Sequence, residues 1–193
     1  MYLLDACDKL IEPFAEHSEN VARTSLMIYQ NLPDIMKRDV FPREGKWKPE
    51  ELVVMCGLYH DIGKSYIEDF YPELITKKSY TEKDRLTIKQ HTLMGAQLIQ
   101  NLYERFGFED YVAVGYLQQT CLMHHEKLDG SGYWQMVNPP KIAQLVTVAD
   151  IYSAGIEKRC YEADKSSERL VEEMYSQRIN QEYVDALVRG LRK

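Results

Sequence analysis

The sequence predicts an all-α fold, a helical bundle with a metal centre in its core. Apolar residues recur at three- or four-residue spacing along most of the chain, and no segment shows the apolar–polar alternation of a strand. All five histidines fall on inward faces or at the ends of the expected helices, where metal ligands would be needed. The 193 residues suffice to bury a core without metal or disulfide support, so stability alone does not demand a metal.

The first two helices are expected over residues 2–14 and 18–32. Ser18 is the expected N-cap of the second helix, since serine hydroxyls accept hydrogen bonds from free main-chain N–H groups at a helix start. His17 falls one turn before Val21, on the apolar face of this helix.

The next region is expected to alternate loops with one helix. Residues 33–49 contain three prolines and many charges, which predicts a loop long enough to cover or gate a site. Pro49 then opens a helix over residues 50–62, because proline suits the first helical position. Gly63 is expected to stop this helix directly after a His-Asp pair, and residues 65–80 are expected to be irregular.

A long helix is expected from Thr81 to Phe106. Thr81 is followed three residues later by Asp84, a spacing that is typical of a helix start. His91 lies on the apolar stripe of this helix, and Gly95 follows one turn later.

The last third of the chain predicts further helices separated by one glycine-rich loop. A helix over residues 110–125 ends in a histidine doublet, and the loop over 126–140 follows it. A largely apolar helix over 141–158 carries Asp150. Amphipathic helices over 166–175 and 180–191 complete the chain.

Composition narrows the classes of partner and compartment. The four cysteines are far apart and show no CxxC spacing, which indicates buried, reduced thiols. The chain start has no basic region before an apolar one, and no apolar run is long enough to span a bilayer. We therefore expect a cytoplasmic protein without a membrane partner. A formal net charge of −6 argues against a nucleic-acid polymer as partner but leaves room for a small anionic ligand at bound cations.

Imidazoles and carboxylates without thiolate donors predict a catalytic centre and argue against a structural zinc knot. The candidate ligands are His17, His60, Asp61, His91, His124, His125 and Asp150. This set is large enough for two divalent ions, and a pair of ions can clamp a phosphate and activate water. Hydrolysis is the leading chemistry.

Several motifs carry a resemblance to a known family. They are HDIGK at 60–64, IKQHTLMGAQLI at 88–99, HHEKLDGSGY at 124–133, KIAQLVTVADIYSA at 141–154, and HSENVAR beginning at His17. Together they resemble the HD-GYP family, a branch of the HD phosphohydrolase superfamily. The resemblance runs from about residue 14 to 163 within an expected single domain of residues 1–193, whose C-terminal helices occupy 164–193.

The resemblance implies an HD-domain helical bundle that hydrolyses cyclic dinucleotides, chiefly cyclic di-GMP, by attack of a metal-bridging hydroxide. The metals it implies are iron or manganese, with zinc, nickel, cobalt or magnesium as further possibilities. One ion would be surrounded by His17, His60, Asp61 and Asp150. The other would be held by His91, His124 and His125, with Asp61 bridging both.

The resemblance also implies substrate contacts. Lys64 would lie near the bridging hydroxide or the scissile phosphate, and Arg159 would contact a substrate phosphate. Gly132 and Tyr133 belong to the glycine-rich signature, where glycine permits close approach and the tyrosine ring or hydroxyl can meet a ligand.

Three positions depart from the family pattern. Trp134 replaces the proline that names the family, and Pro13 stands where some members carry a glutamate for a third metal, which favours two ions. Glu162 stands where members that grip a dinucleotide tend to be basic. Trp134 and Glu162 keep open a second reading, a hydrolase of another nucleotide or phosphomonoester, and a non-catalytic nucleotide receptor is a third. The oligomeric state is not predicted.

Overall fold

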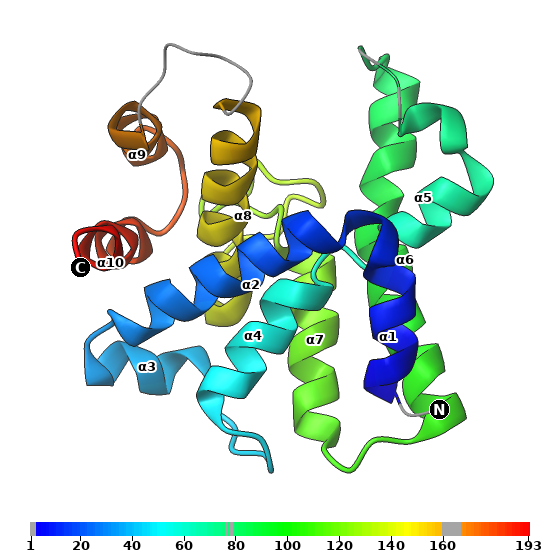
Figure 1. The fold of residues 1–193 in the computed structure, drawn as a ribbon, viewed down its shortest axis with the longest axis horizontal. Helices are drawn as coiled ribbons and strands as arrows, with labels where there is room; N and C mark the ends of the chain where they lie inside the picture. Colours follow the sequence, from blue (N-terminus) through cyan, green and yellow to red (C-terminus); the bar gives the residue numbers. More distant parts are fainter. Residues whose placement is uncertain (1–2, 76, 78, 160–166) are drawn as a thin grey trace.

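The computed structural model describes residues 3–75, 77, 79–159 and 167–193, and every regular element in these ranges is helical (Figure 1). The α-helices are α1 (Leu3–Ile11), α2 (Ala15–Gln30), α3 (Asp34–Val40), α4 (Pro49–Tyr59), α5 (Lys64–Phe70), α6 (Glu82–Phe106), α7 (Tyr111–Met123), α8 (Lys141–Arg159), α9 (Ser167–Tyr175) and α10 (Gln181–Leu191). Two 3-10 turns, η1 (Glu12–Phe14) and η2 (Pro72–Leu74), lie between them. The predicted all-α class is confirmed.

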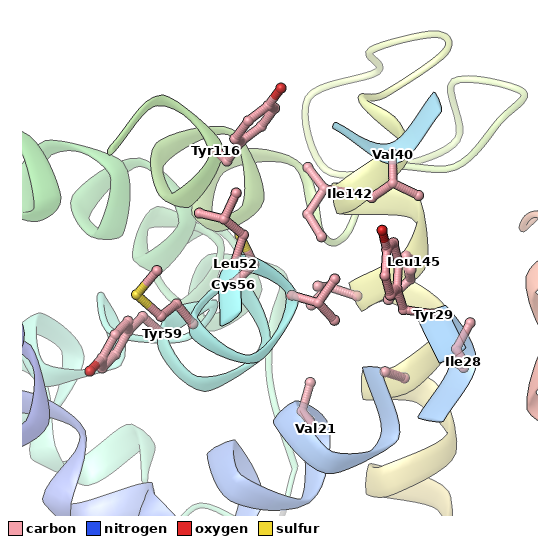
Figure 2. Packing of buried hydrophobic residues seen from close by; sticks show 14 of the residues in the cluster. Val21, Ile28, Tyr29, Val40, Leu52, Cys56, Tyr59, Tyr116, Ile142 and Leu145 are labelled. Carbon is pink, nitrogen blue, oxygen red and sulfur yellow. The ribbon is translucent and has the colours of Figure 1, made fainter. Parts of the chain in front are cut away.

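The core forms where α2 packs against α4 and α8, and where α7 packs against α4 and α6. Buried side chains from these helices meet in one cluster, which Figure 2 shows for Val21, Ile28, Leu52, Cys56 and Leu145. Full burial of an apolar side chain of this size contributes roughly 1.5–3 kcal/mol relative to exposure. This packing holds the helices that carry the candidate ligands in fixed relative positions.

Helix α8 is the most deeply buried element near the candidate ligands. All residues from 142 to 149 are buried, as expected for a helix that is apolar on nearly all sides. Its Thr147 hydroxyl donates to the main-chain oxygen of His124, with 2.6 Å between the oxygens. This hydrogen bond joins α8 to the end of α7 one turn before Asp150.

Three sequence predictions about local structure are wrong. Ser18 is not an N-cap: α2 begins at Ala15, and Ser18 is buried inside the helix, because η1 leads directly into α2 without a side-chain cap. Residues 33–49 are not all loop, since they contain α3, whose last residue, Val40, is buried in the core. Residues 65–80 include most of α5 and all of η2, so they are not irregular throughout.

The segment after α3 lies at the opposite end of α7 from the histidine doublet. Asp110, at the start of α7, accepts hydrogen bonds from the main-chain nitrogens of Lys46 and Trp47, and Tyr116 bonds the main chain of Arg43. The segment therefore does not cover the candidate site, contrary to expectation.

The predicted burial of the cysteines is confirmed for those that the structure describes. Cys7, Cys56 and Cys121 are free and buried, and Cys160 lies outside the described residues. Burial is the main cause that raises the pKa of the Cys56 thiol to about 12, so it stays protonated and unreactive. Among the described helices, none is both long and apolar enough to cross a membrane.

Candidate metal centre

The His60–Asp61 pair lies in the turn that follows α4. The main-chain oxygens of Tyr59 and Asp61 accept hydrogen bonds from Ile62 and Lys64, so the chain makes a tight helical turn before α5 begins. Both residues are buried, with exposed fractions of 0% for His60 and 2% for Asp61. A buried carboxylate in this position needs charged or hydrogen-bonding partners.

Gly63 brings α6 against this turn. A methyl group at Gly63 would lie 2.5 Å from the Gly95 nitrogen and would also overlap the main-chain oxygen of His91. The φ angle of Gly63 is −70°, so the position requires glycine for close approach and not for a left-handed conformation. This corrects the prediction that Gly63 acts as a helix stop, and it explains how His91 comes next to Asp61.

Asp61 lies between two sets of imidazoles. Its Oδ1 is 3.1 Å from Nε2 of His91 and 3.5 Å from Nε2 of His124. Its Oδ2 is 3.2 Å from Nε2 of His60 and 3.9 Å from Nε2 of His17, and it also contacts the Lys64 ammonium. Each carboxylate oxygen therefore faces a different set.

The donors divide into two groups within which the ligand atoms all lie within 4.8 Å of one another. Group A consists of His17, His60 and Asp150. Group B consists of Asp61, His91, His124 and His125. All seven residues predicted as ligands belong to one group or the other, and they come from α2, α6, α8 and the turns after α4 and α7.

Main-chain carbonyls set the tautomer of three of the histidines. Nδ1 of His60 lies 2.7 Å from Gly57 O, Nδ1 of His91 lies 2.7 Å from Ile88 O, and Nδ1 of His124 lies 3.0 Å from both Thr120 O and Cys121 O. A carbonyl oxygen only accepts, so Nδ1 carries the proton and Nε2 of the neutral ring has a free lone pair. Metal-binding histidines are held in this way.

The histidine nitrogens and aspartate oxygens that converge here are better suited to binding a cation than to bonding with one another. His60 Nε2 and Asp61 Oδ1 are both buried and form no hydrogen bond. Lone pairs on nitrogen and carboxylate oxygen repel at these distances unless a positive charge lies between them, and leaving them unsatisfied is costly. This chain carries a divalent-metal site of histidine and aspartate donors.

Nearby positive charge and hydrogen bonds keep Asp61 and Asp150 ionised. Burial alone would raise the pKa of Asp61, but the Lys64 charge and the nearby His60 hold it well below its usual value. Burial likewise opposes ionisation of Asp150, whose pKa is lowered overall, chiefly by a hydrogen bond from His17. For Lys64, burial lowers the pKa, but the charge and hydrogen bond of Asp61 outweigh it and the net shift is upward. Lys64 is therefore a protonated ammonium beside Asp61.

The glycine-rich loop folds over His125 and is anchored by Glu126. The buried Glu126 carboxylate accepts hydrogen bonds from the main-chain nitrogens of Trp134 and Met136, each at 2.8 Å. A methyl group at Gly132 would lie 2.5 Å from Glu126 Cα, so the loop needs glycine at this close approach. The half-buried Tyr133 ring packs on His125, with 4.4 Å between the ring centroids.

Trp134, which departs from the family pattern, contacts two side chains of α6. Its indole nitrogen donates to Thr92 Oγ1 at 2.8 Å, and the Lys89 ammonium lies over its ring, 4.1 Å from the centroid. Sequence reasoning missed Thr92 and Glu126 as supports of the site. Glu126 had a signal, since it directly follows the histidine doublet.

Two positions that bear on substrate recognition lie at the end of α8 and after it in the chain. Arg159 is the last residue of α8, but its side chain lies outside the described part of the chain. Glu162 also lies outside the described residues.

Comparison with known proteins finds relatives of similar sequence. The sequence is 32% identical over 145 residues to the "Cyclic di-GMP phosphodiesterase response regulator RpfG" of Xanthomonas campestris, which covers 72% of this chain and 36% of that protein. It is 30% identical over 129 residues to a "Cyclic di-GMP phosphodiesterase" of Vibrio cholerae, covering 63% of this chain and 25% of the relative. A "3'3'-cGAMP-specific phosphodiesterase 1" of Vibrio cholerae is 25% identical over 150 residues, 73% of this chain and 32% of that protein.

A solved structure has the same fold. The HDG"Y"P protein Bd1817 from Bdellovibrio bacteriovorus aligns with a TM-score of 0.64 at 18% identity, covering 93% of this chain and 52% of that one. The chain spans about a quarter to a third of the length of the curated relatives described above. The HD domain family matches residues 14–155, and the chain belongs to this family.

Proposed function

We propose that this protein is a metal-dependent phosphodiesterase that opens a cyclic dinucleotide such as cyclic di-GMP. The observation that carries the proposal is Asp61, whose two oxygens face different donor groups at 3.1–3.9 Å from the histidine nitrogens. This arrangement suits two divalent ions, with His17, His60 and Asp150 on one and His91, His124 and His125 on the other. The matches to relatives named as cyclic-dinucleotide phosphodiesterases support the substrate class.

When bound, a pair of such ions neutralises charge on a phosphoryl group and activates water at neutral pH. Nitrogen and oxygen donors without thiolate suit iron or manganese, which we propose as the ions, while zinc, nickel, cobalt and magnesium remain to be compared by loading. Asp61 would bridge both ions, and its ionised state at neutral pH fits this role.

The chain supplies the remaining groups. Lys64 is protonated and contacts Asp61, so its ammonium can donate a hydrogen bond to a phosphate oxygen or a proton to the leaving 3′ oxygen. Tyr133, packed on His125 beside Gly132, offers a ring or hydroxyl at the edge of group B. Arg159 remains our proposed contact to a second phosphate.

We further propose that residues 1–193 act as one domain in the cytoplasm on a small anionic nucleotide, without a membrane or nucleic-acid polymer as partner. The core cluster contains residues from every α-helix except α5, which supports a single folding unit.

A second candidate is hydrolysis of another nucleotide or phosphomonoester. Trp134 favours it, because an indole fixed by Thr92 and Lys89 occupies the position of the family's proline and can alter which base fits. The third reading is a receptor that binds a nucleotide without cleaving it.

A substrate panel separates these functions. Protein purified anaerobically and loaded with Fe²⁺ or Mn²⁺ would be incubated with cyclic di-GMP, 3′3′-cGAMP, nucleoside phosphates and a chromogenic diester. We expect a linear dinucleotide as product, and no turnover from Asp61→Ala. Rapid cleavage of simple nucleotides with inert cyclic dinucleotides would favour the second candidate, and tight binding without product would favour the receptor.

A further inference from the structure

Glu157 lies against His17, although 140 positions separate the two residues. Its carboxylate oxygens are 3.0 and 3.1 Å from Nδ1 of His17, and Asn20 donates its side-chain N–H to Oε1 of Glu157 at 3.1 Å. Glu157 belongs to neither donor group. Its contact is with the ring nitrogen of His17 that faces away from Asp150.

Helix geometry explains the placement. Asp150 and Glu157 are seven residues apart on α8, about two turns, and therefore point to the same side of the helix. His17 and Asn20 are three residues apart on α2, which packs against α8. The His17 ring thus lies between two acids, with Nε2 at 3.2 Å from Asp150 and Nδ1 at 3.0 Å from Glu157.

The contact sets the chemistry of His17. When an ion is bound at group A, Nε2 of His17 must offer it a lone pair, so Nδ1 carries the ring proton and donates it to the Glu157 carboxylate. A carboxylate behind a ligating imidazole fixes the ring orientation and makes the ring a stronger donor. His60, His91 and His124 receive this support from neutral main-chain carbonyls instead.

A simple surface ion pair would not explain this arrangement as well. Exposed ion pairs are screened by solvent, and their long side chains are held only weakly in one geometry. Here the carboxylate is about one-third exposed at 35%, the imidazole is only 18% exposed, and both oxygens of Glu157 are used.

We propose that Glu157 is a positioning residue of the metal centre, which holds His17 in the Nδ1–H tautomer and strengthens binding of the ion at group A. The inference rests on the proposed two-ion centre and adds a residue to it. It assigns Glu157 no contact with the substrate or with an ion.

Metal titration tests the proposal without measuring activity. Metal-free wild type, Glu157→Ala and Glu157→Gln would be titrated with Mn²⁺ by calorimetry. We expect Glu157→Ala to weaken the binding of one of the two ions by about 10–100-fold and to leave the affinity for the other unchanged. Glu157→Gln should lose less, because its amide oxygen still accepts the Nδ1–H bond but carries no charge. Glu19→Gln, an exposed site on α2 paired with Arg23, is the matched control with no expected change.

Ring-nitrogen NMR of ¹⁵N-histidine protein, without metal, reports which ring nitrogens carry protons and what they contact. We expect Glu157→Ala to shift the His17 signals while the other four histidines keep theirs. If Glu157→Ala fails to fold, Asn20→Ala replaces it, since loss of the Asn20 hydrogen bond should weaken the same ion to a smaller degree. Wild-type affinity for both ions with unchanged His17 signals would overturn the role of Glu157. A wild type that binds no Mn²⁺ would instead overturn the proposed metal centre itself.

Discussion

The two donor groups differ in what holds them. Three of the four residues of group B are deeply buried, with side-chain exposures of 3% for Asp61, 1% for His91 and 0% for His124, while His125 is half-buried. The rings of His91 and His124 are held by carbonyls three or four residues earlier in the same helix. In group A, His60 is also fully buried, but the side chains of His17 and Asp150 are 18% and 13% exposed, and His17 is held by a side chain of another helix.

This difference teaches that one centre combines local and tertiary positioning. A helix that forms correctly already orients His91 and His124, because their partners lie within one turn. His17 is oriented only when α2 and α8 pack together. Group A should therefore respond more to changes in helix packing between α2 and α8, and group B more to changes at α6.

Removing one ligand from each group has the largest expected effect. His91→Ala should lose the ion of group B and His17→Ala the ion of group A, so the bound metal falls from two ions to one in each. Each ion contributes several kcal/mol to a transition state, so turnover should fall roughly a thousandfold. Metal analysis by mass spectrometry and turnover of a cyclic dinucleotide would measure both. Two ions retained in either variant would contradict the division into groups.

A change at Gly63 should affect group B through packing. Gly63→Ala adds a methyl group that overlaps the main chain around His91 and Gly95, so α6 must shift. We expect a loss of about 1–3 kcal/mol in the free energy of unfolding and weaker metal binding at group B. Urea denaturation and Mn²⁺ titration would measure these effects.

Gly115→Ala is the control for this substitution. Gly115 lies inside α7, and a methyl group there would meet no atom within 4 Å. Replacing a helical glycine by alanine should stabilise the protein by about 0.5–1 kcal/mol without altering metal binding. Equal effects from both substitutions would show that the contact between Gly63 and α6 is not special.

Titration of the metal-free protein gives the smallest expected effect. It distinguishes the two groups by the direction in which the pKa values of their histidines are shifted. Burial lowers the pKa of His17, but its hydrogen bond to Asp150 and the acid charges outweigh burial, so the pKa lies above 6.5. Burial is the main cause that lowers the pKa of His124 and of His125 below 6.5. NMR of the histidine rings between pH 5 and 8 would measure these values.

The shifts have opposite consequences for the stability of the metal-free protein. The contribution of His17 is fully present below its unfolded pKa and is lost as pH rises through its higher folded pKa. The contributions of His124 and His125 are present above the unfolded pKa and are lost as pH falls through their lower folded values. A single shared pKa for the three rings would contradict the electrostatic contrast between the groups.

Elements with strong local signals were predictable from the sequence. The long helix predicted from Thr81 to Phe106 matches α6, because the Thr81 hydroxyl and the Asp84 carboxylate cap its first turn reciprocally. Asp110 likewise caps α7. The short α3 had no such cap, and it is stabilised by burial of Val40 and Phe41 in the core. That gain depends on neighbours distant in the chain, so the local pattern did not reveal it.

The sequence by itself determined the donor chemistry, since residue type and helical periodicity put imidazoles and acids on inward faces. It also indicated the family through motifs that are contiguous in the chain. Only the tertiary structure decided which donors lie together and what orients each ring, because these depend on helix contacts such as Gly63 with Gly95 and Glu157 with His17. The physical reason is the separation of the partners along the chain. Hydrogen bonds within a helix are fixed by the spacing of residues in the sequence, whereas contacts between helices depend on how the whole core packs.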